Sequence, residues 1–359
     1  MCDTRDLLHF VGSIPLDSSA DVFRRLSGEV SAFLRRIPDG ETGERARWIR
    51  FQQTMLEGHP AIEVDAAEPP LPVLQSDGTV LREIRRVRLK PDVDAEGVEF
   101  DTGYDRAALG SYETFRRLRD EGTVPPGVRF QLALPTPMAT GLMYVSPNGR
   151  ERYLRCYERC LLRALGTIAA SIPHDELSIQ FDVCQEVLMF ENYFPEGNAG
   201  YKEPIFQQFA RLAAAVPGDV ELGFHLCYGS PGDQPLIRLH DAKVLVELMN
   251  GIGASVERPV HFIHIPVPRH AGDAFFAPLV DWRRPAGTHL YLGLLQYDDA
   301  AGNEARIAAA RRVVQDFGVG AECGFGRIDP KRVPGLLAGH RAAAQLLASL
   351  QAAGAVDRD

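Results

Sequence analysis

Short apolar segments typical of buried strands alternate along this chain with longer segments typical of amphipathic helices, and the alternation recurs eight times. The predicted strands are Leu7–Pro15, Phe33–Pro38, Val128–Pro135, Leu177–Asp182, Val220–Cys227, Val260–Pro266, His289–Tyr297 and Val319–Cys323. The segments with a 3.6-residue apolar spacing, and so the predicted helices, are Ser19–Arg35, Arg45–Glu57, Arg150–Ile172, Pro204–Val216, Asp241–Ile252, Asn303–Phe317 and Pro330–Leu350. This pattern predicts an α/β fold, a (β/α)8 TIM barrel formed by residues 1–359 as a single domain. A doubly wound open sheet is the alternative, but no Gly-x-Gly-x-x-Gly or Walker A sequence follows a strand to support a nucleotide-binding version.

Residues 61–101 interrupt the alternation after the second predicted strand. They are rich in Pro, Asp and Glu, and they contain a basic run, Arg82–Lys90, that alternates like a strand. We interpret this segment as an insertion with a β-hairpin, placed where it could cover one end of the barrel.

The composition argues against several classes of partner. The net charge is −9, and no basic cluster other than Arg82–Lys90 stands out, so we expect no nucleic-acid partner. No apolar stretch reaches 18 residues, so we expect no membrane span. The N-terminus does not resemble a signal peptide and the six cysteines show no disulfide framework, which together predict a cytoplasmic protein. The oligomeric state stays open, a homo-oligomer included.

Polar and thiol side chains follow the predicted strands at their C-terminal ends, which is where the catalytic groups of a barrel lie. In strand order they are Ser13, Asp39 and Glu41, Thr136, Asp182 with Gln185 and Glu186, His225 with Cys227, His264, the run Tyr297-Asp298-Asp299, and Cys323. One mouth of the barrel is therefore expected to collect thiols, imidazoles and carboxylates.

Among these residues, His225, Cys227 and Cys323 have the character of metal ligands. Side chains two apart on a strand point to the same side, so His225 and Cys227 can bind one ion together. One imidazole and two thiolates suit Zn²⁺, and three protein ligands with an open position are typical of a catalytic site. The alternative is that the cysteines are small buried core residues.

Six motifs in order along the chain resemble the catalytic domain of cobalamin-independent methionine synthase, in the superfamily shared with uroporphyrinogen decarboxylase. They are Val11-Gly-Ser-Ile-Pro15, Asp39-Gly-Glu-Thr-Gly-Glu-Arg45, Ile179-Gln-Phe-Asp182, Phe224-His-Leu-Cys-Tyr228, Leu292-Gly-Leu-Leu295 and Glu322-Cys-Gly-Phe-Gly-Arg327. The resemblance implies a TIM barrel in which zinc activates a thiol and a methyl group moves from a folate to its sulfur.

The same resemblance assigns expected roles to individual residues. It implies that His225, Cys227 and Cys323 are zinc ligands, and that Ser13, Glu41 and Asp182 hold the amino acid thiol. The chain also departs from the family. The family's fourth ligand is a Glu at the end of strand six, where His264 is the best-placed substitute, and Asp182 is followed by Val-Cys-Gln rather than Glu-Pro. We therefore expect a substrate other than that of methionine synthesis.

Other polar residues carry two interpretations each. Asp182, Glu186 and His264 are candidate catalytic groups, although Asp182 and Glu186 could instead form internal ion pairs. Asp39 and Glu41 could bind substrate or begin the following helix. Arg45 and Arg327 could bind a substrate carboxylate, with an ion pair to Glu41 or Glu44 as the alternative for Arg45. Tyr228 could stack on an aromatic donor or belong to the core.

These expectations favour a zinc-dependent methyl or alkyl transferase that acts on a small-molecule donor and a thiol acceptor. A zinc hydrolase or lyase that uses metal-bound water is an alternative, and a requirement for a thiol co-substrate separates the two. A metal-free decarboxylase-like enzyme and a non-catalytic binding barrel are further alternatives, and the two cysteines argue against the decarboxylase.

Overall fold

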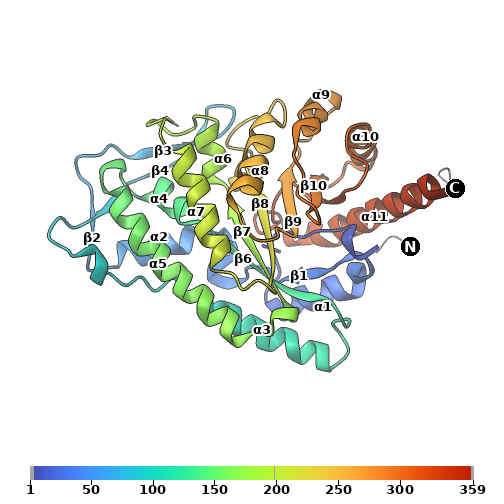
Figure 1. Cartoon of the computed structure of the whole chain (residues 1–359), viewed down its shortest axis with the longest axis horizontal. Coiled ribbons are helices and arrows are strands. Elements are labelled where there is room, and N and C mark those ends of the chain that lie inside the picture. Colours follow the sequence, from blue (N-terminus) through green and yellow to red (C-terminus); the bar gives the residue numbers. More distant parts are fainter. Residues whose placement is uncertain (1–3, 198, 357–359) are drawn as a thin grey trace.

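The computed structural model describes residues 4–197 and 199–356, and its centre is a curled sheet of seven parallel strands flanked by helices (Figure 1). The strands, in their order across the sheet, are β1 (Arg36–Pro38), β6 (Arg129–Pro135), β7 (Leu177–Val183), β8 (Glu221–Leu226), β9 (Phe262–Pro266), β10 (His289–Leu295) and β11 (Gly318–Ala321). All seven overlap predicted strands, and the consecutive parallel order agrees with a TIM-like α/β fold. Every residue of β7 and β8 is buried, as expected for parallel strands covered on both faces.

The prediction of a first strand at Leu7–Pro15 is wrong, and the sheet is not closed into a complete barrel by a ladder of strands. Leu8 forms single parallel bridges with Leu34 on one side and with Val319 on the other, and these bridges span the gap between β11 and β1. After Leu8, the backbone carbonyls of Phe10 and Val11 accept hydrogen bonds from a side chain and not from a neighbouring strand. The amide Nε2 of Gln131 donates to the carbonyl oxygens of Phe10 and Val11 at 2.9 and 2.8 Å. Hydrogen bonds from interior side chains therefore replace the ladder that a regular strand would need.

Eleven α-helices surround the sheet in the described part of the chain (Figure 1). They are α1 (Ser19–Val30), α2 (Arg50–Glu57), α3 (Tyr104–Asp120), α4 (Pro137–Tyr144), α5 (Pro147–Ser171), α6 (Gln185–Phe190), α7 (Lys202–Ala214), α8 (Lys243–Ser255), α9 (Asp273–Phe276), α10 (Ala300–Arg311) and α11 (Val333–Val356). Seven of them overlap the seven predicted helices, whereas α3, α4, α6 and α9 were not predicted. All eight residues of α4 are buried, so this helix has no polar face and no 3.6-residue stripe to recognise.

Residues 61–101 form two small antiparallel sheets at one side of the fold (Figure 1). In one, β2 (Ile62–Val64) pairs with β5 (Val87–Leu89); in the other, β3 (Leu71–Leu74) pairs with β4 (Val80–Ile84). A hairpin is present, but it is formed by β3 and β4, and the basic run contributes to two strands that pair with different partners. The backbone N–H of Ser76, at the tip of this hairpin, donates to the carbonyl of Pro235 at 2.9 Å. The tip therefore contacts the loop that follows β8, at the C-terminal end of the sheet.

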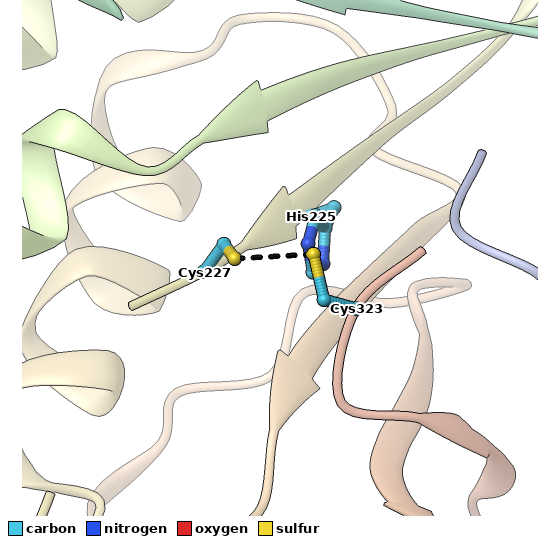
Figure 2. Close-up of side chains that lie close together, drawn as sticks. All are labelled: His225, Cys227 and Cys323. Carbon is cyan, nitrogen blue, oxygen red and sulfur yellow. Dashed lines mark hydrogen bonds between the residues drawn. The ribbon is translucent and has the colours of Figure 1, made fainter. Parts of the chain in front are cut away.

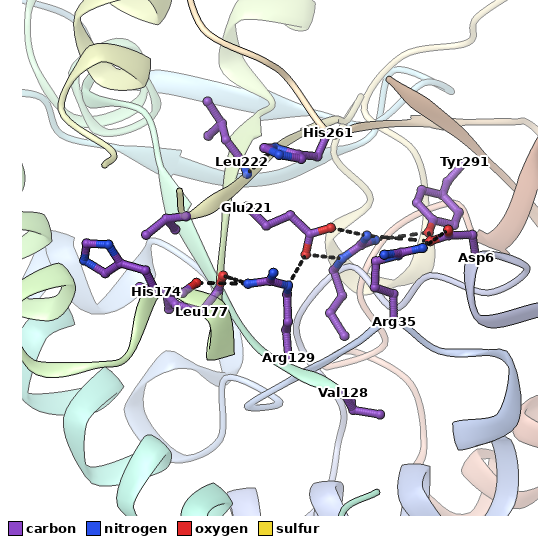
Figure 3. Close-up of polar contacts among 12 residues, drawn as sticks. Asp6, Arg35, Val128, Arg129, His174, Leu177, Glu221, Leu222, His261 and Tyr291 are labelled. Carbon is purple, nitrogen blue, oxygen red and sulfur yellow. Dashed lines mark hydrogen bonds and ion pairs between the residues drawn. The ribbon is translucent and has the colours of Figure 1, made fainter. Parts of the chain in front are cut away.

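The opposite end of the sheet is occupied by a buried charged network (Figure 3). The guanidinium of Arg36 lies 2.7 Å from the carboxylate of Glu221 and donates to the hydroxyl of Tyr291 at 3.1 Å. That hydroxyl donates in turn to Asp6 at 3.1 Å, and Arg129 lies 3.8 Å from Glu221. The network ties the N-terminal ends of β1, β6 and β8 together.

No helix within residues 4–197 and 199–356 is both long and apolar enough to cross a membrane.

Candidate metal centre

Two strand ends bring one histidine and two cysteines together at the C-terminal end of the sheet (Figure 2). His225 lies in β8, Cys227 follows the end of that strand, and Cys323 lies two residues beyond β11. One potential ligand atom from each residue lies within 4.8 Å of the other two, and the two sulfur atoms are 3.4 Å apart. Around a tetrahedral zinc ion with bonds to sulfur of about 2.3 Å, two sulfur atoms are separated by roughly 3.8 Å. The spacing in this structure therefore suits a shared ion.

The orientation of His225 leaves one ring nitrogen free for such an ion. Its Nδ1 lies 2.8 Å from Nδ1 of His264, and Nε2 of His264 lies 3.1 Å from the carbonyl oxygen of Ala321. A carbonyl only accepts hydrogen bonds, so Nε2 of His264 carries a proton and, in a neutral ring, Nδ1 of His264 is the acceptor. His225 then donates from Nδ1, and its Nε2 keeps a lone pair. This Nε2 is buried and has no hydrogen-bond partner among the described residues. Together with two thiols, such a donor set fits zinc.

The position of His264 differs from the one expected of a fourth ligand. Both of its nitrogens are engaged in hydrogen bonds, and it is not part of the group of converging ligand atoms. Burial holds the pKa of His264 well below its usual value, so the ring is neutral. Its ring contacts His225 and lies outside the group of ligand atoms formed by His225, Cys227 and Cys323.

The two cysteines differ in their environment. A hydrogen bond between them, with Cys227 as donor and Cys323 as acceptor, together with the guanidinium of Arg327, lowers the pKa of Cys323 well below its usual value. Hydrogen bonds with Cys184 and Cys323, and burial, raise the pKa of Cys227. The backbone N–H of Gly229 also donates to Sγ of Cys227 at 3.3 Å. One thiolate is thus stabilised by the protein itself, and a bound divalent cation would favour the second.

Two buried carboxyl groups lie beside this group. Asp182 of β7 is in register with His225 of β8, and its oxygens accept from Trp48 Nε1 at 3.1 Å and from Gln180 Nε2 at 2.8 Å. Burial raises the pKa of Asp182 well above its usual value. Burial and the charge of Asp182 do the same to the pKa of Glu41. A positive group placed between the two carboxyls would restore the ionised form of each.

The loop that carries Glu41 is held in an unusual backbone conformation. Glu41 and Trp48 both have positive φ, 47° and 51°, a region that side chains other than Gly seldom adopt. Gly12 allows the close approach of this loop, because a Cβ at that position would lie 2.9 Å from Oε1 of Glu41. A cavity of about 10 Å³, room for roughly one water molecule, is lined by Glu41, Trp48 and Tyr104 among others.

Asp39 and Arg45 form a buried ion pair in the same loop. The alternative interpretation of Arg45 as an ion-pair partner therefore holds with Asp39 in place of Glu41 or Glu44. Asp39 also accepts from the backbone N–H of Glu41 at 3.0 Å, which makes it a turn residue rather than a helix cap. The second terminal nitrogen of Arg45, Nη1, is buried without a hydrogen-bond partner in the described structure.

Ser13 and Tyr228 are brought to the segment around Cys323. The Oγ of Ser13 accepts from the backbone N–H of Gly326 at 3.2 Å, and its carbonyl accepts from Phe325. The hydroxyl of Tyr228 donates to Glu322, and Arg327 lies 3.9 Å from the other oxygen of Glu322. Tyr228 is therefore anchored by its hydroxyl beside the cysteines.

Glu186 lies apart from these residues. It is fully buried, and one carboxyl oxygen accepts from the hydroxyl of Thr136 while the other has no hydrogen-bond partner in the described structure. No hydrogen bond or ion pair described for this chain connects Glu186 with the cysteines or with Asp182. The alternative interpretation of Glu186, an ion pair with Arg150 or Arg152, finds no such contact among the described residues, and Arg150 pairs with Glu196 at 2.7 Å.

The sequence analysis did not single out Glu322 and Gln180. Glu322 accepts a hydrogen bond from Tyr228, and Gln180 donates one to Asp182. Glu322 precedes Cys323, and Gln180 shares the strand parity of Asp182, so both positions were readable signals. Cys184, two residues after Asp182, was not singled out either, yet its hydrogen bond with Cys227 helps to raise the pKa of that thiol.

No family model and no curated protein sequence matches this chain. Solved structures resemble it at low sequence identity, and the following two are among them. A B12-independent methionine synthase from Shewanella sp. W3-18-1, in complex with selenomethionine, superposes with a TM-score of 0.61 at 17% identity, over 98% of this chain and 99% of that one. A putative vitamin-B12 independent methionine synthase from Listeria monocytogenes has a TM-score of 0.54 at 15% identity, over 95% and 96%. At these identities the likeness establishes a shared fold along nearly the whole length of both chains.

Proposed function

We propose that this protein is a zinc-dependent methyl or alkyl transferase that modifies the sulfur of a small thiol. The observation that supports it most directly is the buried, unpartnered Nε2 of His225 beside the thiols of Cys227 and Cys323. A soft donor set with three protein ligands leaves room for a further sulfur. Zinc bound there would lower the pKa of an incoming thiol and hold it as the nucleophile.

The surrounding residues suit an acceptor that also carries an amino group. Glu41 and Asp182 are buried carboxyls, and the pKa of each is raised. An ammonium group would bind there by charge and hydrogen bonding. The free Nη1 of Arg45 could receive one oxygen of a substrate carboxylate. This arrangement favours an amino acid thiol, which agrees with the amino acid bound in the Shewanella structure.

Asp182 is fixed by Trp48 and Gln180, so it is positioned to hold the acceptor rather than to move during the reaction. The donor has to approach with its methyl or alkyl carbon in line with the acceptor sulfur.

The test combines metal content with transfer assays on the purified wild type and Cys227→Ser. We expect about one zinc per chain in the wild type, loss of zinc in the variant, and sulfur alkylation that requires both an amino acid thiol and zinc. Cys156→Ser is the matched control, because this buried cysteine in α5 lies outside the group of ligand atoms. Zinc-dependent turnover without any thiol would instead indicate hydrolysis or elimination, and a wild type without stoichiometric metal would contradict the proposal.

A further inference from the structure

His264 connects the two segments that supply the candidate metal ligands. It is fully buried, with Nδ1 2.8 Å from Nδ1 of His225 in β8 and Nε2 3.1 Å from the carbonyl of Ala321 at the end of β11. Ala321 lies two residues before Cys323. One imidazole ring therefore sets the distance between the strand that carries His225 and the segment that carries Cys323.

The neighbouring strand is built to accommodate this ring. A Cβ at Gly293 in β10 would lie 2.8 Å from Cε1 of His264 and 2.8 Å from the carbonyl oxygen of Ala321, closer than real side chains approach. Only glycine fits at that position while His264 stays in place. The ring therefore occupies a defined slot between β8, β10 and β11.

We propose that His264 is a positioning residue that holds His225 with Nε2 towards the metal, so that the centre has three protein ligands and one open position. The proposal rests on the metal centre of the proposed function and deepens it. The carbonyl of Ala321 requires a proton on Nε2 of His264, which leaves Nδ1 of His264 to accept from Nδ1 of His225. Hydrogen bonds of this kind from a ligand histidine to a neighbour fix both its tautomer and its ring orientation.

The consequence is a more open centre than one in which His264 is a fourth protein ligand. One neutral imidazole and two thiolates balance the two charges of a zinc ion. A fourth protein ligand would close the site, whereas three leave a position for the acceptor sulfur. If His264 were itself a ligand, it would have to give up the hydrogen bond to His225 or the one to Ala321.

Two substitutions separate positioning from ligation. In His264→Gln the amide can accept from His225 through its oxygen and donate to Ala321 through its nitrogen, so both hydrogen bonds survive without an imidazole. In His264→Leu both are lost at similar size. We expect zinc affinity, measured by competition with a chelator, to stay close to wild type in the glutamine variant and to fall about 10–100-fold in the leucine variant. The absorption spectrum of the cobalt-substituted protein should be unchanged by the glutamine variant. Equal loss of affinity in both variants, with a shifted cobalt spectrum in both, would overturn the proposal.

A second readout needs neither metal nor substrate. Nuclear magnetic resonance of the ¹⁵N-labelled histidine rings in the metal-free wild type should show His225 protonated on Nδ1 and His264 on Nε2. The reverse pair of tautomers contradicts the proposal even if zinc binds. The proposed function is contradicted instead if the wild type does not bind zinc, or does not transfer an alkyl group once zinc is bound. In that case the tautomers from this measurement still test the role of His264.

Discussion

Individual carboxyl groups in this protein are buried to a degree that changes their protonation. Glu41 and Asp182 have raised pKa values, and under the proposed function an ammonium group of the acceptor would restore their ionised forms. Glu186 has no such neighbour, and burial alone raises its pKa to about 7. The first two belong to the candidate site, whereas Glu186 affects the stability of the fold.

Glu186→Gln should make the stability of the protein less dependent on pH. The folded state binds the proton of Glu186 more tightly than the unfolded chain, whose carboxyl has a pKa near 4.5. The contribution of this group is therefore fully present below pH 4.5 and is lost as the pH rises through about 7. At pH 8 we expect the variant to exceed wild type by about 1–3 kcal/mol in the free energy of unfolding, measured with urea, and to match it at low pH.

The control for this measurement is Glu304→Gln in α10, because Glu304 is exposed. Its substitution should leave the pH dependence of unfolding as in the wild type. If Glu186→Gln behaved like this control, the buried carboxyl would not be the source of the pH dependence.

At the scale of single residues, the sequence predicted which side chains come together at the candidate site, but it did not predict the contacts that His264 makes. Strand parity was enough to expect His225 and Cys227 on one side of their strand, and the end of β11 placed Cys323 nearby. The same parity suggested that His264 is a ligand. Its actual contacts depend on the carbonyl of Ala321 from another strand, which no spacing in the sequence reveals.

At the scale of elements, the strands buried on both faces were recognisable as apolar runs, and the errors fall where tertiary contacts decide the structure. Leu7–Pro15 reads as a strand but forms only single bridges, because interior glutamine side chains satisfy its carbonyls. The fully buried α4 gives no periodic signal, although Thr136 followed by Pro137 is a readable start. The pairing within residues 61–101 was predictable only as a tendency to form a hairpin.

The hairpin of β3 and β4 should stabilise the loop that follows Cys227. Ser76→Pro removes the backbone N–H that donates to the carbonyl of Pro235. Ser76 is the second residue of a turn that is closed by a hydrogen bond from the N–H of Gly78 to the carbonyl of Gln75. Proline is well tolerated at this position of a turn. We expect faster hydrogen exchange in residues 229–236, by mass spectrometry, and a loss of about 0.5–1.5 kcal/mol in the free energy of unfolding.

Ser76→Ala is the matched control for this change, since it keeps the backbone N–H and removes only the hydroxyl. Exchange in residues 229–236 should remain at the wild-type rate in that variant. Equal exchange in the proline and alanine variants would show that the tip of the hairpin does not hold the loop.

At the scale of the whole molecule, the two ends of the sheet have different tasks. The C-terminal end carries the candidate metal centre, and the N-terminal end carries the charged network around Glu221 (Figure 3). A cavity of about 520 Å³ lies beside this network. Such a division is typical of TIM-like folds, in which residues at the N-terminal face serve stability. The network joins strands that are distant in sequence, because its members lie in β1, β6, β8 and β10.

Breaking this network should destabilise the protein without emptying the metal centre. Glu221→Gln leaves the buried guanidinium of Arg36 without its ionic partner 2.7 Å away, and losing one member of a buried pair costs about 3–5 kcal/mol. Replacing both, Arg36→Met with Glu221→Leu, removes the uncompensated charge and should recover much of that loss.

The same ion pair makes the stability depend on pH. Burial raises the pKa of Glu221, but the charge of Arg36 outweighs burial and lowers the pKa below its usual value. The stabilisation is therefore present above the usual carboxyl pKa and is lost as the pH falls through the lower pKa of the folded state. Urea unfolding at neutral and acidic pH, with zinc content measured in parallel, therefore has a defined outcome. The single variant should lose stability at neutral pH and keep its zinc, whereas loss of zinc in step with stability would show that the two ends of the sheet are not independent.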